Sequence, residues 1–439
     1  MLFRSMERTD KKYSTYVQIL KEELVPAMGC TEPIAIAYAA AKAKEVLAAE
    51  PDRVEILVSN NIIKNVKSVV VPNTGGLKGI EAAAAAGIVA GIAQKQLEVI
   101  SQVSEEQKTA MKKFLQNVPI TVSALDNDVT FDIIIILHAK EEYSKVRISQ
   151  YHTNIIHVEK SGRVLFTTDM QEKLEQGIVE EDEEVGLADK SLLNLADIID
   201  FANTCDLSDV RAILDPQIQY NTAIAEEGLL GDYGANIGTT ILKAYGGDVR
   251  NRAIAHAAAG SDARMSGCEL PVIINSGSGN QGITVSVPVL EYAKELAAPK
   301  DKVYRALIIS NLVAVHEKAG IGRLSAYCGA VSAGCAAGCG IAYLYGGGYE
   351  ELAHTLVNSV AIVSGIICDG AKPSCAAKIA SSVEAGILGY HMYMNGQEFK
   401  YGDGIVNNGV EATIRNIGHL GKEGMKQTDK EIVKLMLDE

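Results

Sequence analysis

The chain changes character along its length, and this division constrains the fold more than any other feature. Between residues 50 and 170, short β-branched runs alternate with polar breaks, at 54–59, 66–71, 120–124, 130–137, 144–150, 155–159 and 164–168. Helical patterns occupy 79–96 and 105–117. Asp126, Asn127 and Asp128 indicate a turn between two of the runs. These patterns predict an antiparallel or mixed sheet accompanied by helices.

The remainder of the sequence is typical of helix. Residues 12–24 form an amphipathic pattern, 34–48 an Ala-rich one, and from about 191 onward helical patterns are interrupted only by recurring glycines. We therefore predict an α+β chain. A large, mostly helical catalytic domain would combine residues 1–48 and 190–439, a smaller sheet-containing α/β domain would span 50–170, and residues 171–189 would form an acidic linker.

Composition excludes several classes of protein. The 439 residues are 47% hydrophobic and 22% charged, as in a globular protein with a substantial core. A net charge of −14 argues against a nucleic-acid groove and an anionic membrane surface. Residues 324–349 carry no charge, but their Ala, Gly, Ser and Cys content favours a buried helix over a membrane span. The charged N-terminus, without an apolar signal core, predicts a cytoplasmic protein with reduced thiols.

Three of the eight cysteines form the most informative set. Cys328 is predicted to begin a helix, and Cys368 to end the helix 355–368. Pro373 then interrupts the chain, which places Cys375 at a helix N-terminus, where the helix dipole and the nearby Lys372 favour a thiolate. Three thiolates arriving from different directions can hold a cubane iron–sulfur cluster and leave one iron open to a substrate.

The other cysteines permit different interpretations. Cys335 and Cys339 share a helical face with Cys328, but thiols two turns apart on one helix are about 10 Å apart and suit a single cluster poorly. We expect them, with Cys205 and Cys268, to be buried apolar residues. The same interpretation stays open for the first three, since no CxxC pair is present. Cys30, far away in sequence, is left as an acid, a base or a temporary fourth ligand.

Two glycine-rich segments suit a small anion. Residues 72–79 follow a predicted strand, and residues 275–282 open the predicted helix 283–296, so that free amides could bind a carboxylate. The second segment does not complete the GxxxxGK[ST] nucleotide motif. Plain structural turns remain the alternative. Glu32, His256 and His316 are further candidates for a base, although a helical His is more often structural.

These motifs together resemble the L-cysteine desulfidase family, which is related to the alpha chain of iron–sulfur L-serine dehydratases. The residues that carry the resemblance are Gly29-Cys30-Thr31-Glu32-Pro33, Asn73-Thr74-Gly75-Gly76, Ser276-Gly277-Ser278-Gly279-Asn280-Gln281-Gly282, and Cys368-Asp369-Gly370-Ala371-Lys372 with Cys375. The resemblance covers nearly the whole chain.

The resemblance implies an oxygen-sensitive 4Fe-4S cluster on Cys328, Cys368 and Cys375, with Cys30 catalytic. It implies a lyase that converts L-cysteine to pyruvate, ammonia and hydrogen sulfide without pyridoxal phosphate, or an L-serine dehydratase of the same family. A regulatory protein that binds a small carboxylate is the alternative outside the enzymes. We expect a small amino-acid substrate, no nucleic acid and no membrane, and leave a homo-oligomer open. The predicted substrate-binding residues are Asn73, Thr74, Gly75, Gly76, Lys78, Ser276, Gly277, Ser278, Gly279, Asn280 and Lys372.

Overall fold

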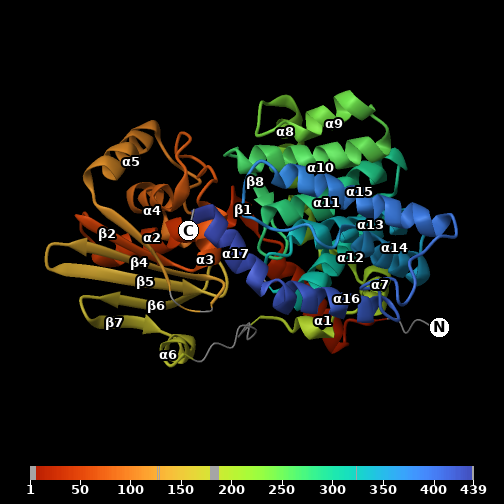
Figure 1. The fold of residues 1–439 in the computed structure, drawn as a ribbon, viewed down its shortest axis with the longest axis horizontal. Helices are drawn as coiled ribbons and strands as arrows, with labels where there is room; N and C mark the ends of the chain where they lie inside the picture. The colour runs from red at the N-terminus through yellow and green to blue at the C-terminus, as the bar shows by residue number, and fades with distance from the viewer. Residues whose placement is uncertain (1–5, 126, 128, 178–186, 323, 438–439) are drawn as a thin grey trace.

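A computed structural model describes residues 6–125, 127, 129–177, 187–322 and 324–437. It shows a mixed six-stranded sheet with its own helices, beside a larger assembly of helices (Figure 1). This arrangement confirms the predicted α+β class. The turn predicted at Asp126, Asn127 and Asp128 falls largely outside the described residues.

The sheet has the strand order β3-β2-β4-β5-β6-β7. All neighbouring strands are antiparallel except β2 and β3, which are parallel. One face is covered by α2, α4 and α5, and inward-facing residues of β4 such as Ile133 and Ile135 are fully buried beneath them. The bounds are β2 Arg53–Val58, β3 Ile120–Ala124, β4 Asp132–Ala139, β5 Glu142–Ser149, β6 Ile155–Lys160, β7 Arg163–Thr167, α2 Thr31–Leu47, α4 Gly79–Ala90 and α5 Glu105–Asn117.

The helical part is built around α13, whose side chains are almost all buried among α11, α12, α14 and α15. Small residues permit this central position because they let helix backbones approach closely. The surrounding helices are α1 Lys11–Glu23, α7 Leu195–Thr204, α8 Arg211–Leu230, α9 Ile237–Tyr245, α10 Val249–Met265, α11 Gly279–Glu295, α12 Lys300–Ile321, α13 Gly329–Leu344, α14 Tyr349–Val363, α15 Cys375–Met394 and α16 Val410–His419. Within the described part of the chain, no helix is both long and apolar enough to cross a membrane.

Among the described residues, the contacts between the two parts include a strand pairing and a helix contact. Strand β1 (Pro26–Met28) leads from α1 to α2 and pairs antiparallel with β8 (Pro271–Ile273). The last helix, α17 (Lys426–Leu437), lies against the short α3 (Asn60–Val66) at the seam between sheet and helices (Figure 1). There Lys64 of α3 forms an ion pair with Asp429 of α17.

Several predicted elements differ from the structure. Residues 66–71 do not form a strand; Val66 ends α3, and only Val70 makes an isolated bridge, to Lys78. Burial of valines in the core, rather than strand pairing, explains this β-branched run. The helix predicted at 79–96 ends at Ala90, and a short 3-10 turn follows. The helix predicted at 355–368 ends at Val363, because Gly365 has φ 126°, which no α-helix accommodates.

The packing of two segments differs from the role that the predicted division gave them. Helix α2 was assigned with residues 1–48 to the helical domain, but it packs on the sheet, where its alanines let α4 approach. A Cβ at Gly87 of α4 would lie only 2.1 Å from the Ala37 carbonyl oxygen. The predicted linker 171–189 begins inside helix α6 (Asp169–Glu175), because Gln171 is buried and accepts a bond from Arg147. Residues 178–186 lie outside the described residues.

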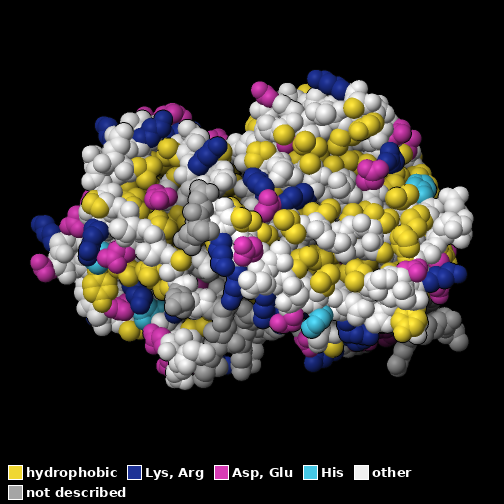
Figure 2. Space-filling model, viewed as in Figure 1, with side chains coloured by type: hydrophobic (Ala, Val, Ile, Leu, Met, Phe, Trp, Pro, Cys, Tyr) yellow, Lys and Arg dark blue, Asp and Glu magenta, His cyan; other side chains and the backbone are white. Residues whose placement is uncertain are grey.

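The surface mixes charges of both signs. On the face shown in Figure 2, Lys and Arg side chains alternate with Asp and Glu over both parts of the molecule. The described residues on this face do not form the continuous basic stripe that is typical of nucleic-acid binding.

Candidate functional site

A short antiparallel pairing brings two of the predicted ligands together. Residues 326–328 pair with 366–368, and the Cys328 amide donates to the Ile366 carbonyl at 3.1 Å. Side chains alternate along paired strands, so Cys328 and Cys368 project from the same face of this pairing. The early end of α14 makes the pairing possible, since a helix reaching residue 368 would leave no extended segment to pair.

The third ligand comes from a loop held by lysines. Cys375 begins α15, as predicted. Lys378, one turn later, donates to the Ile367 carbonyl at 2.8 Å and forms an ion pair with Asp369. Lys372 is paired with the same carboxylate and donates to the Asp369 carbonyl at 3.1 Å. The predicted substrate-binding Lys372 is therefore engaged in shaping the 367–375 loop.

Cys30 caps α2 and belongs to a network of hydrogen bonds. Its thiol donates to Glu32 Oε2 at 3.1 Å, and Asn65 Nδ2 donates to Glu32 Oε1 at 3.1 Å. The Thr31 hydroxyl donates to the Gly277 carbonyl at 2.9 Å, which ties this helix end to the second glycine-rich turn. The Gly29-Cys30 motif therefore meets the 275–282 turn directly.

These segments enclose one cavity of about 110 Å³ at the seam between the sheet part and the helical part. All four singled-out cysteines line it. The volume is several times a water's share of liquid, about 30 Å³, and far below the 300 Å³ or more of a drug-sized site. Its other polar or charged lining residues include Glu32, Lys64, Asn65, His152, Arg264, Ser276, Ser278, Asn280, Gln281, Lys318 and Ser325.

The thiols share the cavity without converging on one point. Among the described residues, no three His, Cys, Asp or Glu side chains are close enough to hold a single metal ion. Cys328 nevertheless interacts electrostatically with both Cys368 and Cys375, which places the three thiols in one electrostatic environment. The three thiols therefore line one cavity together.

Burial dominates the ionisation of these thiols. It raises the pKa of Cys328 to about 12, with Cys368 adding to the shift, and raises that of Cys375 despite Lys372 and Lys378. The backbone hydrogen bond and the lysines at the helix N-terminus favour the Cys375 thiolate, as expected, but burial has the larger effect on its pKa. Loss of the thiol protons would accompany binding of a positively charged metal centre.

The pKa values of Cys30 and Glu32 are shifted in opposite directions. Burial and the neighbouring Glu32 carboxylate raise the pKa of Cys30 well above its ordinary value. Burial is the largest effect and opposes ionisation of Glu32, but His152, the hydrogen bonds from Cys30 and the backbone, and Arg264 together outweigh it, so the Glu32 pKa is lowered. The resting pair is a neutral thiol that donates to a carboxylate.

The two glycine-rich turns have different places. Turn 275–282 lines the cavity with Ser276, Gly277, Ser278 and Asn280, and Gly279 abuts Arg264, which lines the same cavity. The predicted residues Asn73, Thr74, Gly75, Gly76 and Lys78 line neither this cavity nor its neighbour. Asn73 donates to the Ile100 carbonyl at 2.8 Å, and Thr74 to the Val71 carbonyl at 2.7 Å. Their turn supports the site, because Pro72 lies against Gly29, where a Cβ would be 2.7 Å from it.

The remaining candidates lie outside this cavity. Cys205, Cys268, Cys335 and Cys339 are buried in the cores and line neither cavity, as their expected role as apolar residues requires. His256 bonds the Arg252 carbonyl at 2.8 Å, and His316 pairs with Glu411 at 2.7 Å.

Several cavity residues were not found by sequence reasoning. Lys64, Asn65, His152, Arg264 and Lys318 come from segments far apart in the chain, and no motif joins them. Of these residues, only Arg264 could have been noticed in the sequence, because it is a charged residue near the end of an Ala-rich stretch, shortly before the second glycine-rich turn. In the structure it is 2% exposed.

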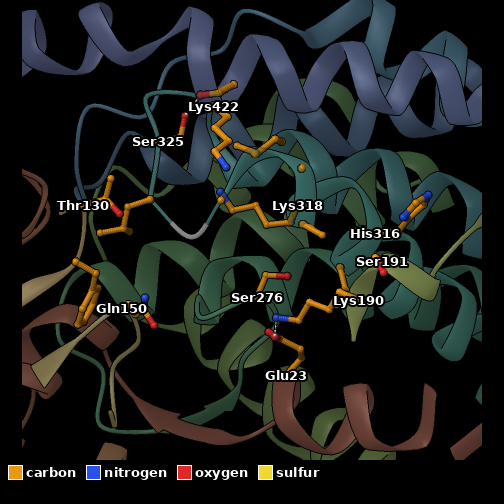
Figure 3. Close-up of a pocket in the computed structure, with 18 of the residues that line it drawn as sticks. Glu23, Thr130, Gln150, Lys190, Ser191, Ser276, His316, Lys318, Ser325 and Lys422 are labelled. Atoms are coloured by element: carbon orange, nitrogen blue, oxygen red, sulfur yellow. Dashed lines mark hydrogen bonds and ion pairs between the residues drawn. The ribbon is translucent and has the colours of Figure 1, made fainter. Parts of the chain in front are cut away.

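A second, larger cavity of about 690 Å³ adjoins the first, and Ser276, Lys318, Leu324 and Ser325 line both. Figure 3 shows Lys318 and Lys422 extending into its centre from opposite sides, with the Lys190–Glu23 ion pair below them. The two cavities therefore lie on either side of these four shared residues.

Comparison with known proteins identifies the family. The chain is 60% identical to a UPF0597 protein of Desulfitobacterium hafniense over 99% of both chains. It is 52% identical to one of Lachnoclostridium phytofermentans, over 97% of this chain and 100% of the relative. It is 45% identical to one of Treponema denticola, over 98% and 100%. The family model described as "Serine dehydratase alpha chain" matches residues 94–434. The chain belongs to the serine dehydratase alpha chain family.

The matched region contains Cys328, Cys368 and Cys375 together with Arg264 and the 275–282 turn. Cys30 and Glu32 precede it, within the part that the UPF0597 relatives cover. The narrower resemblance to L-cysteine desulfidases stays a prediction.

Proposed function

We propose that this chain is an iron–sulfur-dependent, pyridoxal-phosphate-independent lyase. It would eliminate sulfide from L-cysteine, or water from L-serine, to give pyruvate and ammonia. The observation that carries the proposal is the gathering of Cys30, Cys328, Cys368 and Cys375 from separate segments around one cavity of amino-acid size. Membership of a family named for a serine dehydratase supports a lyase of this type.

The residues of the cavity fit a cubane cluster. Three thiols reach it from two paired segments and a helix N-terminus, and three thiolates are the number that can hold a cubane with one iron left open. Lys378 lowers the pKa of Cys328 and of Cys375 against the larger effect of burial, so it would favour their thiolate forms. The chemistry that a bound cluster supplies is Lewis-acid activation of the departing thiol or hydroxyl.

The chain's own residues supply the base. The ionised Glu32 and the protonated Cys30 form a relay: the Cys30 sulfur takes the substrate's α-proton as its own proton passes to Glu32 Oε2, 3.1 Å away. The electron pair of the broken Cα–H bond forms the Cα–Cβ double bond, and the β-substituent leaves with the bonding pair as sulfide or hydroxide. The resulting aminoacrylate tautomerises and hydrolyses to pyruvate and ammonia.

The test is anaerobic reconstitution with iron and sulfide, followed by measurement of pyruvate from L-cysteine and L-serine side by side. Cys328→Ser should lose both the visible iron–sulfur absorption and pyruvate formation. Cys205→Ala, at a buried cysteine outside the cavity, is the matched control and should keep both. Absence of iron binding by the wild-type chain would return the cysteines to a purely structural role and refute the proposal.

Cys30→Ala separates catalysis from ligation. We expect it to lower turnover by about 10²–10⁴-fold, the usual contribution of a positioned acid–base group, while the cluster still assembles. Loss of the cluster in this variant would instead make Cys30 a ligand.

A further inference from the structure

The cavity contains a buried cation that no side chain neutralises through a hydrogen bond. Arg264 projects from the last turn of α10, and its Nε and Nη2 atoms have no hydrogen-bond partner among the described residues. Arg264 interacts electrostatically with the Glu32 carboxylate, but a buried guanidinium without hydrogen bonds is still costly, because desolvation removes its water without replacing the lost bonds. Arg264 therefore lowers the stability of the folded chain unless a ligand accepts the missing hydrogen bonds.

A second feature beside Arg264 also attracts an anion. Helix α11 begins at Gly279, and a Cβ there would lie only 2.3 Å from Arg264 Nε. Only glycine therefore allows the first turn of this 17-residue helix to contact the guanidinium. The positive end of the helix dipole and a fork of N–H donors meet at one point, which matches the geometry of a carboxylate.

Unpartnered acceptors line the same small cavity. Asn280 Oδ1, Gln281 Oε1 and Asn65 Oδ1 are buried and accept no hydrogen bond from the described residues. Asn65 is oriented by its other amide atom, which donates to Glu32. Oxygen acceptors beside the ionised Glu32 suit an ammonium group rather than a second anion.

We infer that Arg264 and the N-terminus of α11 bind the α-carboxylate of a small α-amino acid, while the free amide oxygens of Asn65, Asn280 and Gln281 face its ammonium group. This inference rests on the proposed function for the location of the site, but it concerns binding rather than elimination. It makes Arg264 the specificity residue for the carboxylate.

The test compares ligands that differ by one charged group. Dissociation constants of L-serine, L-serinamide and L-glycerate are measured anaerobically by calorimetry with the reconstituted wild type, Arg264→Gln and Arg252→Gln. Arg252 is the matched control, since it forms ion pairs with Glu291 and Glu295 away from the cavity. Arg264→Gln should weaken L-serine and glycerate binding by about 10- to 100-fold, as loss of a charge-assisted bond predicts, and leave serinamide unchanged. Arg252→Gln should leave all three dissociation constants unchanged.

If Arg264→Gln weakens the binding of serine and serinamide equally, or leaves serine binding unchanged, the assignment of Arg264 is wrong. It is also wrong if the wild type binds none of the three, or binds inorganic phosphate in preference to serine. Serine binding without pyruvate release from either L-serine or L-cysteine would instead refute the proposed elimination and leave Arg264 assigned. Thermal unfolding without ligand provides an independent check: Arg264→Gln should be at least as stable as the wild type, whereas a structural arginine would lower the melting temperature. Arg264→Lys, which keeps the charge but not the fork, should recover part of the serine affinity.

Discussion

Replacing Gly386 by alanine tests whether the close approach of α13 and α15 determines the geometry of the cavity that the four cysteines line. The two helices run parallel, since Gly334 meets Ser382 and Gly338 meets Gly386. Their N-terminal ends carry Cys328 and Cys375. Any separation of the helices therefore moves two of the three predicted ligands.

The size of the perturbation follows from the contacts. A Cβ at Gly386 would lie 2.3 Å from the Gly334 carbonyl oxygen, about 1.1 Å short of the 3.4 Å of an ordinary contact. Overpacking of this kind costs about 1–3 kcal/mol, and the higher helix propensity of alanine offsets about 1 kcal/mol. Gly260→Ala is the control, because its Cβ would meet only a methyl of Ile283 at 3.1 Å and the Ala225 Cα at 3.4 Å.

The assay is urea unfolding of both variants, followed by iron content after anaerobic reconstitution. Gly386→Ala should be about 1–3 kcal/mol less stable than Gly260→Ala and should retain less iron. Equal unfolding midpoints and equal iron content would show that the backbone contact between the helices can relax without consequence, and the reasoning would fail.

Three further predictions concern charge. Glu32→Gln should lower pyruvate formation by about 10²–10⁴-fold without loss of iron, because the relay loses its final acceptor; unchanged turnover would exclude Glu32. The cluster-free chain should lose stability above pH 9.0, because folding raises the Cys328 pKa from 9.0 to about 12. The contribution of the protonated thiol to the free energy of unfolding is complete below pH 9.0 and declines by about 1.4 kcal/mol per pH unit up to pH 12. Urea midpoints of the wild type and Cys328→Ser across this range measure the decline. A midpoint independent of pH would contradict this. Asp132→Asn should cost about 3–5 kcal/mol by leaving Arg147, bonded to it at 2.6 and 2.9 Å, buried and unpaired; a loss below 1 kcal/mol would show that the site rehydrates.

Local patterns predicted the elements well where periodicity and burial agree. The strands of the sheet and the helix starts at Cys328 and Cys375 follow directly from alternation and from the Pro373 break. Residues 66–71 were mistaken for a strand because a buried turn and a buried strand both require β-branched side chains. The end of α14 was missed because it depends on the positive φ of Gly365, which composition does not reveal.

The candidate site was predictable only in part, for a related reason. Cysteines and glycine-rich turns carry recognisable local motifs, so Cys30, Cys328 and the 275–282 turn could be named in advance. Arg264 and Lys64 enter the cavity through tertiary packing of segments that are unremarkable in sequence. The 72–79 turn shows the opposite error, since its motif suggested binding while its side chains satisfy their own backbone.

The ion pair between Lys64 and Asp429 has a consequence for how the protein is made. Lys64 lines the cysteine cavity, and its partner lies 365 positions later in the chain. Contacts of such long sequence separation form late, because closing so large a loop is entropically costly. During synthesis the sheet part can fold early, but Lys64 stays without its Asp429 partner until α17 has left the ribosome. Iron should therefore be retained only after α17 has emerged, and ribosome-bound chains stalled before α17 should retain less of it than chains that contain α17.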